Sequence, residues 1–400
     1  MKDIKNIIQH YPSDLKTEII KISNSFDDVS TRDTTRSLGF CEPNIIEIVK
    51  ELATHYPTVK VLFDGGYEGA EKEKVLLYPE YFSDVDSGVK IFEVKSELGA
   101  GTRGASLGVD AIKIAALDFG SRFFKQYQSI EVPNENHLLL ESAGNTHAKR
   151  ISGVLTMLER VNEEVARVIK NGDFPVVLAG DHSTAAGTIA GIKSAYPKSR
   201  LGVIWIDAHA DLHTPYTTPS GNIHGMPIAV SLGEDNVESK INKPDQETIN
   251  YWYQLKNVGG ISPKIMPNDL VYIGVRDTEK QEDYLIKKFS IKKFTTTEIR
   301  RKGVEKIAIE SLAYLDHCEI IYVSFDVDSM DAGISKGTGT PVPNGITEKE
   351  AGNLVARLME SPKVCCFEIV EINPTLDKEN LMAENAFEIL VRATNQLIND

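Results

Sequence analysis

From about residue 89 onward, the chain repeats one hydrophobic pattern: a short apolar run rich in β-branched residues, then a longer segment with helical spacing. Runs that are apolar at nearly every position are typical of strands buried on both faces of a sheet. Alternation of such strands with helices predicts a parallel sheet covered by helices on both faces, which is a three-layer α/β domain. The strand-like runs are residues 89–94, 175–178, 202–206, 270–273, 320–325 and 364–370.

Residues 1–86 have a different pattern and predict a small, separate α+β domain, which leaves residues 87–400 as the second domain. Helical spacing and short strand-like runs both occur within it. The helical segments are 4–8, 15–22 and 45–52, and the strand-like ones are 58–63 and 74–77.

A glycine-rich stretch, residues 97–108, separates the first strand of the larger domain from a helix that we expect to start near residue 109. It lacks the lysine and the spacing of a phosphate-binding loop, so it predicts a tight strand-to-helix connection near the rim of an active site. Residues 133–136 predict a surface loop, and residues 149–169 predict a long amphipathic helix.

Polar side chains follow every one of the later strand-like runs. Because carboxyl ends of parallel strands meet at one edge of a sheet, these side chains should converge there. Alternation along an extended chain would also place Asp207, His209 and Asp211 on one side. A helix start capped by an aspartate explains that stretch alone, but not the recurrence. The side chains are Asp181, His182, Asp207, His209, Asp211, Arg276, Asp277, Asp326, Asp328, Glu371 and Asn373.

Several closely spaced carboxylates would repel one another unless a cation lay between them. Four aspartates and two histidines without a cysteine form a hard oxygen and nitrogen ligand set, which suits Mn²⁺ or a neighbouring divalent ion. The set is large enough for two ions that share carboxylates. The six residues are His182, Asp207, His209, Asp211, Asp326 and Asp328.

Composition narrows the choice of partners. The formal net charge of −14 disfavours non-specific binding to nucleic acid or anionic membranes and fits a cationic substrate better than an anionic one. The four cysteines have neither zinc-site spacing nor a disulfide framework. A secretion signal and a long apolar segment are also missing from the sequence, so we expect a cytoplasmic protein.

The motifs together resemble the arginase (ureohydrolase) family, in the family's order, from about residue 96 to the C-terminus. This resemblance implies a binuclear manganese hydrolase, and Ser220-Gly221-Asn222-Ile223-His224-Gly225 is closer to arginases than to agmatinases or formimidoylglutamases. The other matching motifs are residues 180–183, 207–211, 324–331, 337–342 and 371–374.

The resemblance implies two overlapping metal sites, with Asp207 and Asp326 as bridges. One ion would be held by His182, Asp207, Asp211 and Asp326, and the other by Asp207, His209, Asp326 and Asp328. A hydroxide between the ions would hydrolyse the guanidino group of L-arginine to L-ornithine and urea.

Further roles follow from the same resemblance. Glu371 would hold the substrate guanidinium, and Thr340 would line that end of the pocket. Asp211 would pass a proton to the departing amine, while His224 would exchange protons with solvent.

The amino-acid head of the substrate would be bound by residues that depart in part from the family pattern. His213 replaces a typical asparagine and Glu279 a typical aspartate, whereas Ser220 and Asn222 match. Histidine can still donate to a carboxylate and glutamate can still accept from an ammonium, which favours L-arginine. The alternatives are another guanidino substrate, such as guanidinobutyrate or agmatine, and a non-catalytic metal-binding or RNA-associated protein.

Family resemblance also implies a homo-oligomer, either a trimer or a hexamer.

Residues 33–94 resemble the N-terminal domain of bacterial S4-type RNA-binding proteins, most clearly at 63–71 and 77–81. The basic S4 module that follows in that family is not recognisable here. Lys72 and Lys74 lie among acidic neighbours, which favours a packing or oligomer-contact domain over an RNA-binding one.

Overall fold

The computed structural model describes residues 19–25, 36–41, 43–53, 59–64, 73–79, 88–127 and 129–397. It divides into two compact units. The larger unit contains residues 88–113 and 127–397, and the smaller one groups residues 114–126 and 398–400 with residues 1–87. Among the described residues, no helix combines the length and the apolar character needed to cross a membrane.

The smaller unit contains an antiparallel sheet in the order β1 (Arg36–Cys41), β3 (Glu73–Pro79) and β2 (Val59–Asp64), together with α3 (Pro43–Ala53). The predicted α+β character is therefore confirmed, although β1 was not predicted. The apolar positions of α3 are buried, which explains its helical spacing: they are Ile45, Ile46, Ile48, Val49 and Leu52.

Several predictions for this unit fall outside the described residues. Residues 4–8 and part of 15–22 are among them, and so are residues 65–71 and 80–81, which make up most of the two clearest parts of the resemblance to S4-type proteins.

The larger unit is built on an eight-stranded sheet in which every neighbouring pair is parallel, as predicted. All six predicted strands are present. Two edge strands of three residues each, β5 and β9, were not predicted. The sheet order is β5 (Ser129–Glu131), β4 (Val89–Val94), β6 (Phe174–Ala179), β11 (Val364–Val370), β10 (Ile320–Asp326), β7 (Leu201–Ile206), β8 (Leu270–Ile273) and β9 (Lys292–Phe294).

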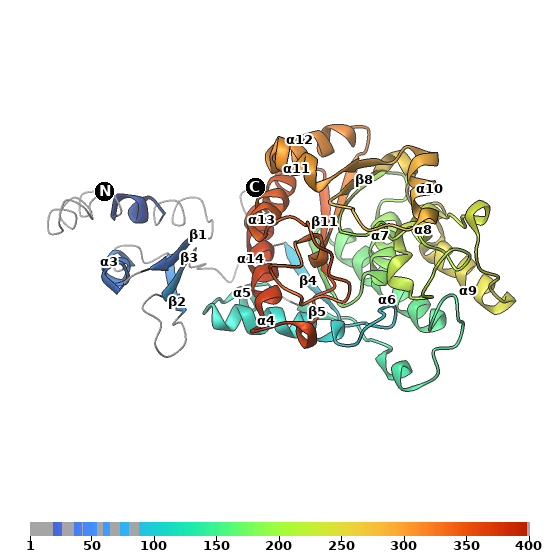
Figure 1. The fold of residues 1–400 in the computed structure, drawn as a ribbon, viewed down its shortest axis with the longest axis horizontal. Helices are drawn as coiled ribbons and strands as arrows, with labels where there is room; N and C mark the ends of the chain where they lie inside the picture. The colour runs from blue at the N-terminus through green and yellow to red at the C-terminus, as the bar shows by residue number, and fades with distance from the viewer. Residues whose placement is uncertain are drawn as a thin grey trace. The chain divides into compact units, whose positions relative to one another are not determined.

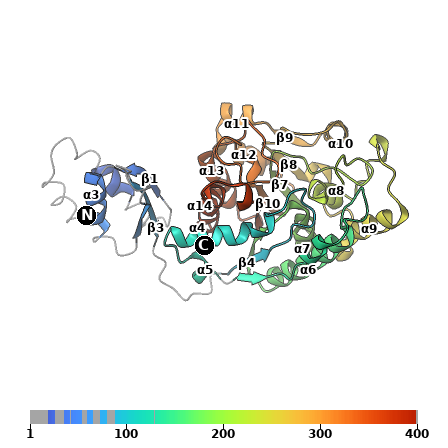
Figure 2. The ribbon, with the colours of Figure 1, turned by 60° about the horizontal axis from the view of Figure 1, so that its bottom comes forward.

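Helices cover both faces of this sheet, with α6 and α7 on one face and α12, α13 and α14 on the other (Figures 1 and 2). Two further helices are α4 (Gly108–Asp118), whose residues from 114 onward belong to the smaller unit, and α5 (Phe123–Gln126), which belongs to the smaller unit entirely. The rest are α6 (Ile151–Lys170), α7 (Ala185–Ala195), α8 (Pro227–Leu232), α9 (Gln246–Asn257), α10 (Lys280–Phe289), α11 (Thr296–Lys302), α12 (Val304–Tyr314), α13 (Glu348–Met359) and α14 (Leu381–Asn395).

Burial explains why these residues form strands. All six residues of β7 are buried, and Trp205, Tyr272 and Tyr322 are among the largest fully buried side chains. Strands covered on both faces need apolar side chains at successive positions, and the sequence supplies them.

The register brings the carboxyl ends of the central strands to the same level. Asp326 of β10 pairs with Val370 of β11, and Phe325 pairs with Ile206 of β7. The next residues along β7 and β11 are Asp207 and Glu371, so three acidic side chains leave the sheet side by side. β11 is the last strand in the chain, yet it lies between β6 and β10 near the centre of the sheet.

Candidate active site

The six predicted metal ligands gather at this carboxyl edge, and His182 is at the centre of the first group. Its Nδ1 lies 3.1 Å from Asp207 Oδ2, 3.2 Å from Asp211 Oδ2 and 3.1 Å from Asp326 Oδ2. All four residues are buried. Four donors from three strand ends thus surround one point.

A second group forms around His209. Its Nδ1 lies 3.0 Å from Asp328 Oδ2 and 3.5 Å from Asp207 Oδ1. Asp207 therefore points one carboxylate oxygen at each histidine, which is the geometry that a bridging ligand needs. Asp326 contacts His182 of the first group, and its bridging role remains a prediction.

The residues after β7 converge by a different route from the one predicted. The strand ends at Ile206, and Asp211 has a left-handed φ of 52°, so these residues do not alternate along an extended chain. Hydrogen bonds hold this loop in place instead. Asp207 Oδ1 accepts from the His209 N–H at 2.6 Å, and the Tyr272 hydroxyl donates to Ala210 O at 2.5 Å. The three side chains do converge as predicted, but strand alternation, the reason given for it, was wrong.

The hydrogen bonds of His182 leave buried atoms that a cation would fit. Its Nε2 lies 2.8 Å from Ser324 Oγ, and its ring stacks on Trp205 with centroids 4.0 Å apart and planes 6° apart. A neutral ring that donates to Ser324 turns a bare Nδ1 lone pair toward three carboxylate oxygens. Neither His182 Nδ1 nor Asp207 Oδ2 has a hydrogen-bond partner, although both are buried. The residues therefore fit a hard divalent cation.

The pKa values of the cluster indicate the same demand for positive charge. Burial and repulsion from Asp328 and Asp207 raise the pKa of Asp326 well above its ordinary value. Burial and the charge of Asp207 raise the pKa of Asp211 to about 6. Burial disfavours a charged His182, but the surrounding carboxylates outweigh burial and raise its pKa. Without metal, protons must supply the missing charge.

Glu371 and His224 lie next to the first group. Glu371 Oε1 accepts from the His182 backbone N–H at 3.0 Å and lies 3.0 Å from His224 Nδ1. Burial lowers the pKa of His224, but the Glu371 carboxylate outweighs this and raises it to about 9. Thr340 Oγ1 donates to Asp328 Oδ2 at 3.1 Å. Both predicted guanidinium-end residues, Glu371 and Thr340, thus contact predicted metal ligands.

The four predicted head-group residues form two pairs. His213 Nε2 lies 2.9 Å from Glu279 Oε2, whereas Ser220 Oγ accepts from the Asn222 backbone N–H at 3.1 Å. A residue that was not predicted, Glu282, joins the first pair. Its carboxyl accepts from the backbone N–H groups of Leu212 and Glu279 at 3.0 and 3.1 Å.

Sequence reasoning assigned no role to Ser324, Trp205 or Glu282. Ser324 had a usable signal, because it lies two residues before Asp326 on the same strand and alternation places both on one side. Trp205 has the same relation to Asp207. Glu282 had only a local signal, its place three residues after Glu279 at the start of α10, since its contacts with Leu212 and His213 come from a distant loop.

The glycine-rich stretch lies against these residues. The Gly99 N–H donates to Asp181 Oδ2 at 2.9 Å, and Gly99 O accepts from the His224 N–H at 3.2 Å. A Cβ on Gly101 would lie 2.5 Å from Asn222 Nδ2. Glycine is therefore needed here for close approach to the site.

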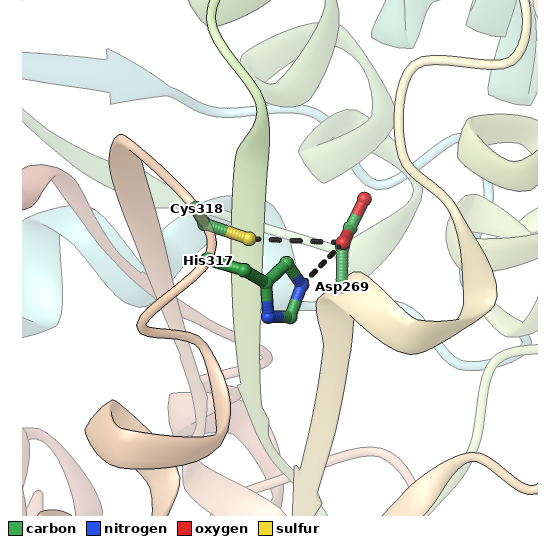
Figure 3. Close-up of side chains that lie close together, drawn as sticks. All are labelled: Asp269, His317 and Cys318. Carbon is green, nitrogen blue, oxygen red and sulfur yellow. Dashed lines mark hydrogen bonds and ion pairs between the residues drawn. The ribbon is translucent and has the colours of Figure 1, made fainter.

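A separate polar cluster, which we call the amino-edge cluster, consists of Asp269, Arg200, His317 and Cys318. The buried Asp269 Oδ1 accepts from Arg200 Nε at 2.7 Å and lies 2.9 Å from His317 Nε2 and 3.7 Å from Cys318 Sγ; Figure 3 shows the last two contacts. Burial raises the pKa of the Cys318 thiol to about 12, which keeps it protonated. Arg200 neutralises this carboxylate, so the cluster is a structural ion network.

Known proteins resemble this chain in sequence and in fold. A sequence model of the arginase family matches residues 87–394. The arginase of Bacillus subtilis (strain 168) is 36% identical over 307 residues, which cover 76% of this chain and 97% of that protein.

Comparison with solved structures points to the same family. The arginase of Bacillus caldovelox, in its native structure at pH 5.6, aligns with a TM-score of 0.66 and 33% identity, covering 78% of this chain and 98% of its own. The arginase of Entamoeba histolytica, in complex with L-ornithine, aligns with a TM-score of 0.65 and 26% identity, covering 76% and 97%. The chain therefore belongs to the arginase family, a group of ureohydrolases with binuclear metal centres.

Proposed function

We propose that this protein hydrolyses the guanidino group of L-arginine to L-ornithine and urea with two Mn²⁺ ions. The observation that carries the proposal is the pair of imidazole nitrogens, His182 Nδ1 and His209 Nδ1, which face opposite oxygens of Asp207 at 3.1 and 3.5 Å. Glu371 lies beside this pair, and relatives named arginase cover the same residues.

The residues that would hold the ions are the two groups described above. His182, Asp207, Asp211 and Asp326 would hold one ion, and Asp207, His209, Asp326 and Asp328 the other. A guanidinium carbon is a poor electrophile, and the chemistry that such a pair of ions supplies is the activation of water near neutral pH. The hard oxygen and nitrogen donors favour Mn²⁺ over thiophilic ions.

Glu371 would bind the substrate guanidinium. Its carboxylate is buried, and its pKa is lowered because His224 outweighs the effect of burial. It is therefore ionised and can form a charge-assisted hydrogen bond with a guanidinium. Since Oε1 already contacts the His182 backbone and His224, Oε2 is the oxygen left for the substrate. Thr340 would line the same end.

Two residues would move protons. Asp211, whose carboxylate lies in the first group, would pass a proton to the departing amine. His224 is half-buried and would exchange protons with solvent, while its ring Nδ1 contacts the Glu371 carboxylate.

The amino-acid head would be bound by the two pairs at the rim. Ser220 and Asn222 offer a hydroxyl and an amide to the α-carboxylate, and Glu279 offers an acceptor to the α-ammonium. His213 lies between Glu279 and Glu282, at 2.9 and 3.5 Å from their carboxyl oxygens. It would connect the residues that bind the α-ammonium with those that bind the α-carboxylate.

Urea release from L-arginine, agmatine and 4-guanidinobutyrate, each with Mn²⁺-loaded protein, tests this function. Agmatine has no carboxylate, so it would lose the hydrogen bonds of the exposed Ser220 and the half-buried Asn222, worth about 0.5–1.5 kcal/mol each. L-Arginine should therefore have the highest kcat/KM. A higher value for either competitor would overturn the head-group assignment, and failure of all three substrates would overturn the function.

We also infer that residues 87–400 contain the whole active site, because every assigned residue lies between His182 and Glu371. Residues 1–86 would then serve packing or oligomer contacts in a cytoplasmic trimer or hexamer. A chain starting near Gly88 should keep both metals. Loss of metal from a truncated chain that still folds would contradict this division.

A further inference from the structure

The segment before α6 packs closely on the loop of Ser220 and Asn222. The Lys149 N–H donates to Gly221 O at 2.8 Å. Gly221 has a φ of 77°, and a Cβ at this position would lie only 2.0 Å from Thr146 O. The two backbones therefore approach as closely as a glycine allows, and this contact fixes Lys149 relative to the loop.

The side chain of Lys149 continues this contact. Its Nζ donates to Asn222 Oδ1 at 3.1 Å. Because an ammonium can only donate, the amide oxygen must face it, and the amide nitrogen must point the other way. A Cβ on Gly101 would lie 2.5 Å from that nitrogen, so the amide is confined between the lysine and the glycine-rich loop. Its N–H groups remain donors for a ligand.

Ser220 adds another donor. Its Oγ accepts from the Asn222 backbone N–H at 3.1 Å, which leaves its own proton for another acceptor. In the described part of the chain, no carboxylate lies within ion-pair distance of Lys149, which is half-buried. A hydroxyl, an amide and an ammonium without an ion pair thus meet at one loop, and an anion is the ligand that suits such donors.

We propose that Lys149 is a positioning and specificity-determining residue, which orients Asn222 and adds positive charge where the substrate's α-carboxylate binds. This inference rests on the proposed function and assigns the substrate to the guanidino acids with a free carboxylate. Glu279 is paired with His213 and is left for the α-ammonium. Opposite charges at the two ends of the head would fix its orientation.

Lys149→Met removes the ammonium while keeping much of the stem. We expect KM for L-arginine to rise about five- to tenfold with kcat changed less than about twofold, because a half-exposed charge contributes to ground-state binding. The kcat/KM for agmatine should stay the same, since agmatine has no carboxylate. Lys149→Arg should keep most of the affinity for L-arginine. High salt should weaken L-arginine binding to the wild type and leave the Met variant nearly unaffected.

Lys170→Met is the matched control. Lys170 is an exposed residue at the far end of α6, so this variant has the same chemical change without contact to the loop. Its kinetic constants should equal those of the wild type for every substrate.

Calorimetric titration with L-ornithine and with putrescine gives a readout without turnover. L-Ornithine should bind the Lys149→Met variant about five- to tenfold more weakly than the wild type, and putrescine should bind both equally. Equal losses for both ligands, or an unchanged ratio of L-arginine to agmatine kcat/KM, would overturn the role of Lys149. A wild-type protein that releases no urea from L-arginine would instead overturn the proposed function.

Discussion

Both edges of the large sheet contain buried carboxylates beside histidines, but their charge balance differs. In the amino-edge cluster one carboxylate, Asp269, has a guanidinium at 2.7 Å and an imidazole at 2.9 Å. At the carboxyl edge, four aspartates and Glu371 share only three imidazoles, those of His182, His209 and His224. The protein neutralises the first edge by itself, whereas the second needs cations from outside.

The comparison shows that short distances between ligand-type atoms do not define a metal site. Asp269, His317 and Cys318 lie as close together as the residues around His182. However, Arg200 already occupies the Asp269 oxygen, and a metal would have to displace that charge. Around His182, the bare Nδ1 faces only acceptors. Whether the charges of a cluster are balanced is therefore more informative than how tightly it is packed.

The largest effect should follow from removing one carboxylate of the cluster at the carboxyl edge. Asp326→Ala should lose the bound metal and reduce urea release by about a thousandfold or more, because the cluster would no longer hold the ions that activate water. The metal-free variant should be no less stable than the metal-free wild type, since a repelling charge has been removed. Elemental analysis, urea assays and thermal unfolding measure these effects. Two tightly held ions with normal turnover would show that the site is misplaced.

Metal removal should have the next largest effect. Ions that bind only the folded protein stabilise it by about 4 kcal/mol per site when their concentration is a thousand times Kd. Thermal unfolding should therefore move to lower temperature when a chelator removes the metal. The shift should disappear in Asp326→Ala and persist in a variant of Asp269. An equal shift in all three proteins would mean that the metal binds elsewhere.

Ser324→Ala tests whether a neighbouring hydroxyl supports one proposed metal ligand, His182, at the carboxyl edge. It removes the partner of His182 Nε2, which fixes the ring so that Nδ1 faces the carboxylates. Loss of such a supporting bond to a metal ligand weakens metal affinity about 10- to 100-fold. Metal titration should show this loss, and Ser324→Thr, which keeps the hydroxyl, should restore part of it. Unchanged affinity in the alanine variant would contradict the role given to this hydroxyl.

The smallest effect should come from the amino-edge cluster. Asp269→Asn removes the charge that Arg200 and His317 share, and because the Arg200 side chain is 43% exposed, we expect a loss of only about 1–2 kcal/mol in the free energy of unfolding. Metal content and kcat should not change. Asn268→Ala removes only the exposed contact to Arg200 Nη2 and should cost less than about 0.5 kcal/mol. Metal loss in Asp269→Asn would mean that the two edges are coupled.

The fold could be predicted from sequence wherever burial leaves a continuous apolar run. All six predicted strands of the large sheet have such a run. β5 and β9 lack one: β9 contains Lys292 and Lys293 and has three residues at the edge of the sheet. Short, half-exposed edge strands are formed by pairing with a neighbour, and that pairing cannot be read from their own residues.

The sequence predicted which residues gather at the site but not how their side chains are arranged. The six proposed metal ligands could be placed together because parallel strands end at one edge. The left-handed Asp211 and the contacts of Glu282 depend on a folded loop, and local pattern does not show them. Lys149 and Asn222 are 73 residues apart and meet only because Gly221 admits the backbone of Thr146.

The position of β11 has a consequence for how the protein is made. This strand is the last to leave the ribosome, yet its place is between β6 and β10. Until residues 364–370 have been synthesised, the sheet consists of two separate halves, with His182 on one and Asp207 and Asp326 on the other. An incomplete chain would therefore lack the first group, whereas Asp207, His209 and Asp328 of the second group already lie on one half. Insertion of one strand closes the hydrophobic core and brings both His182 and Glu371 to the site in the same step, so uptake of the first ion should coincide with the completion of folding.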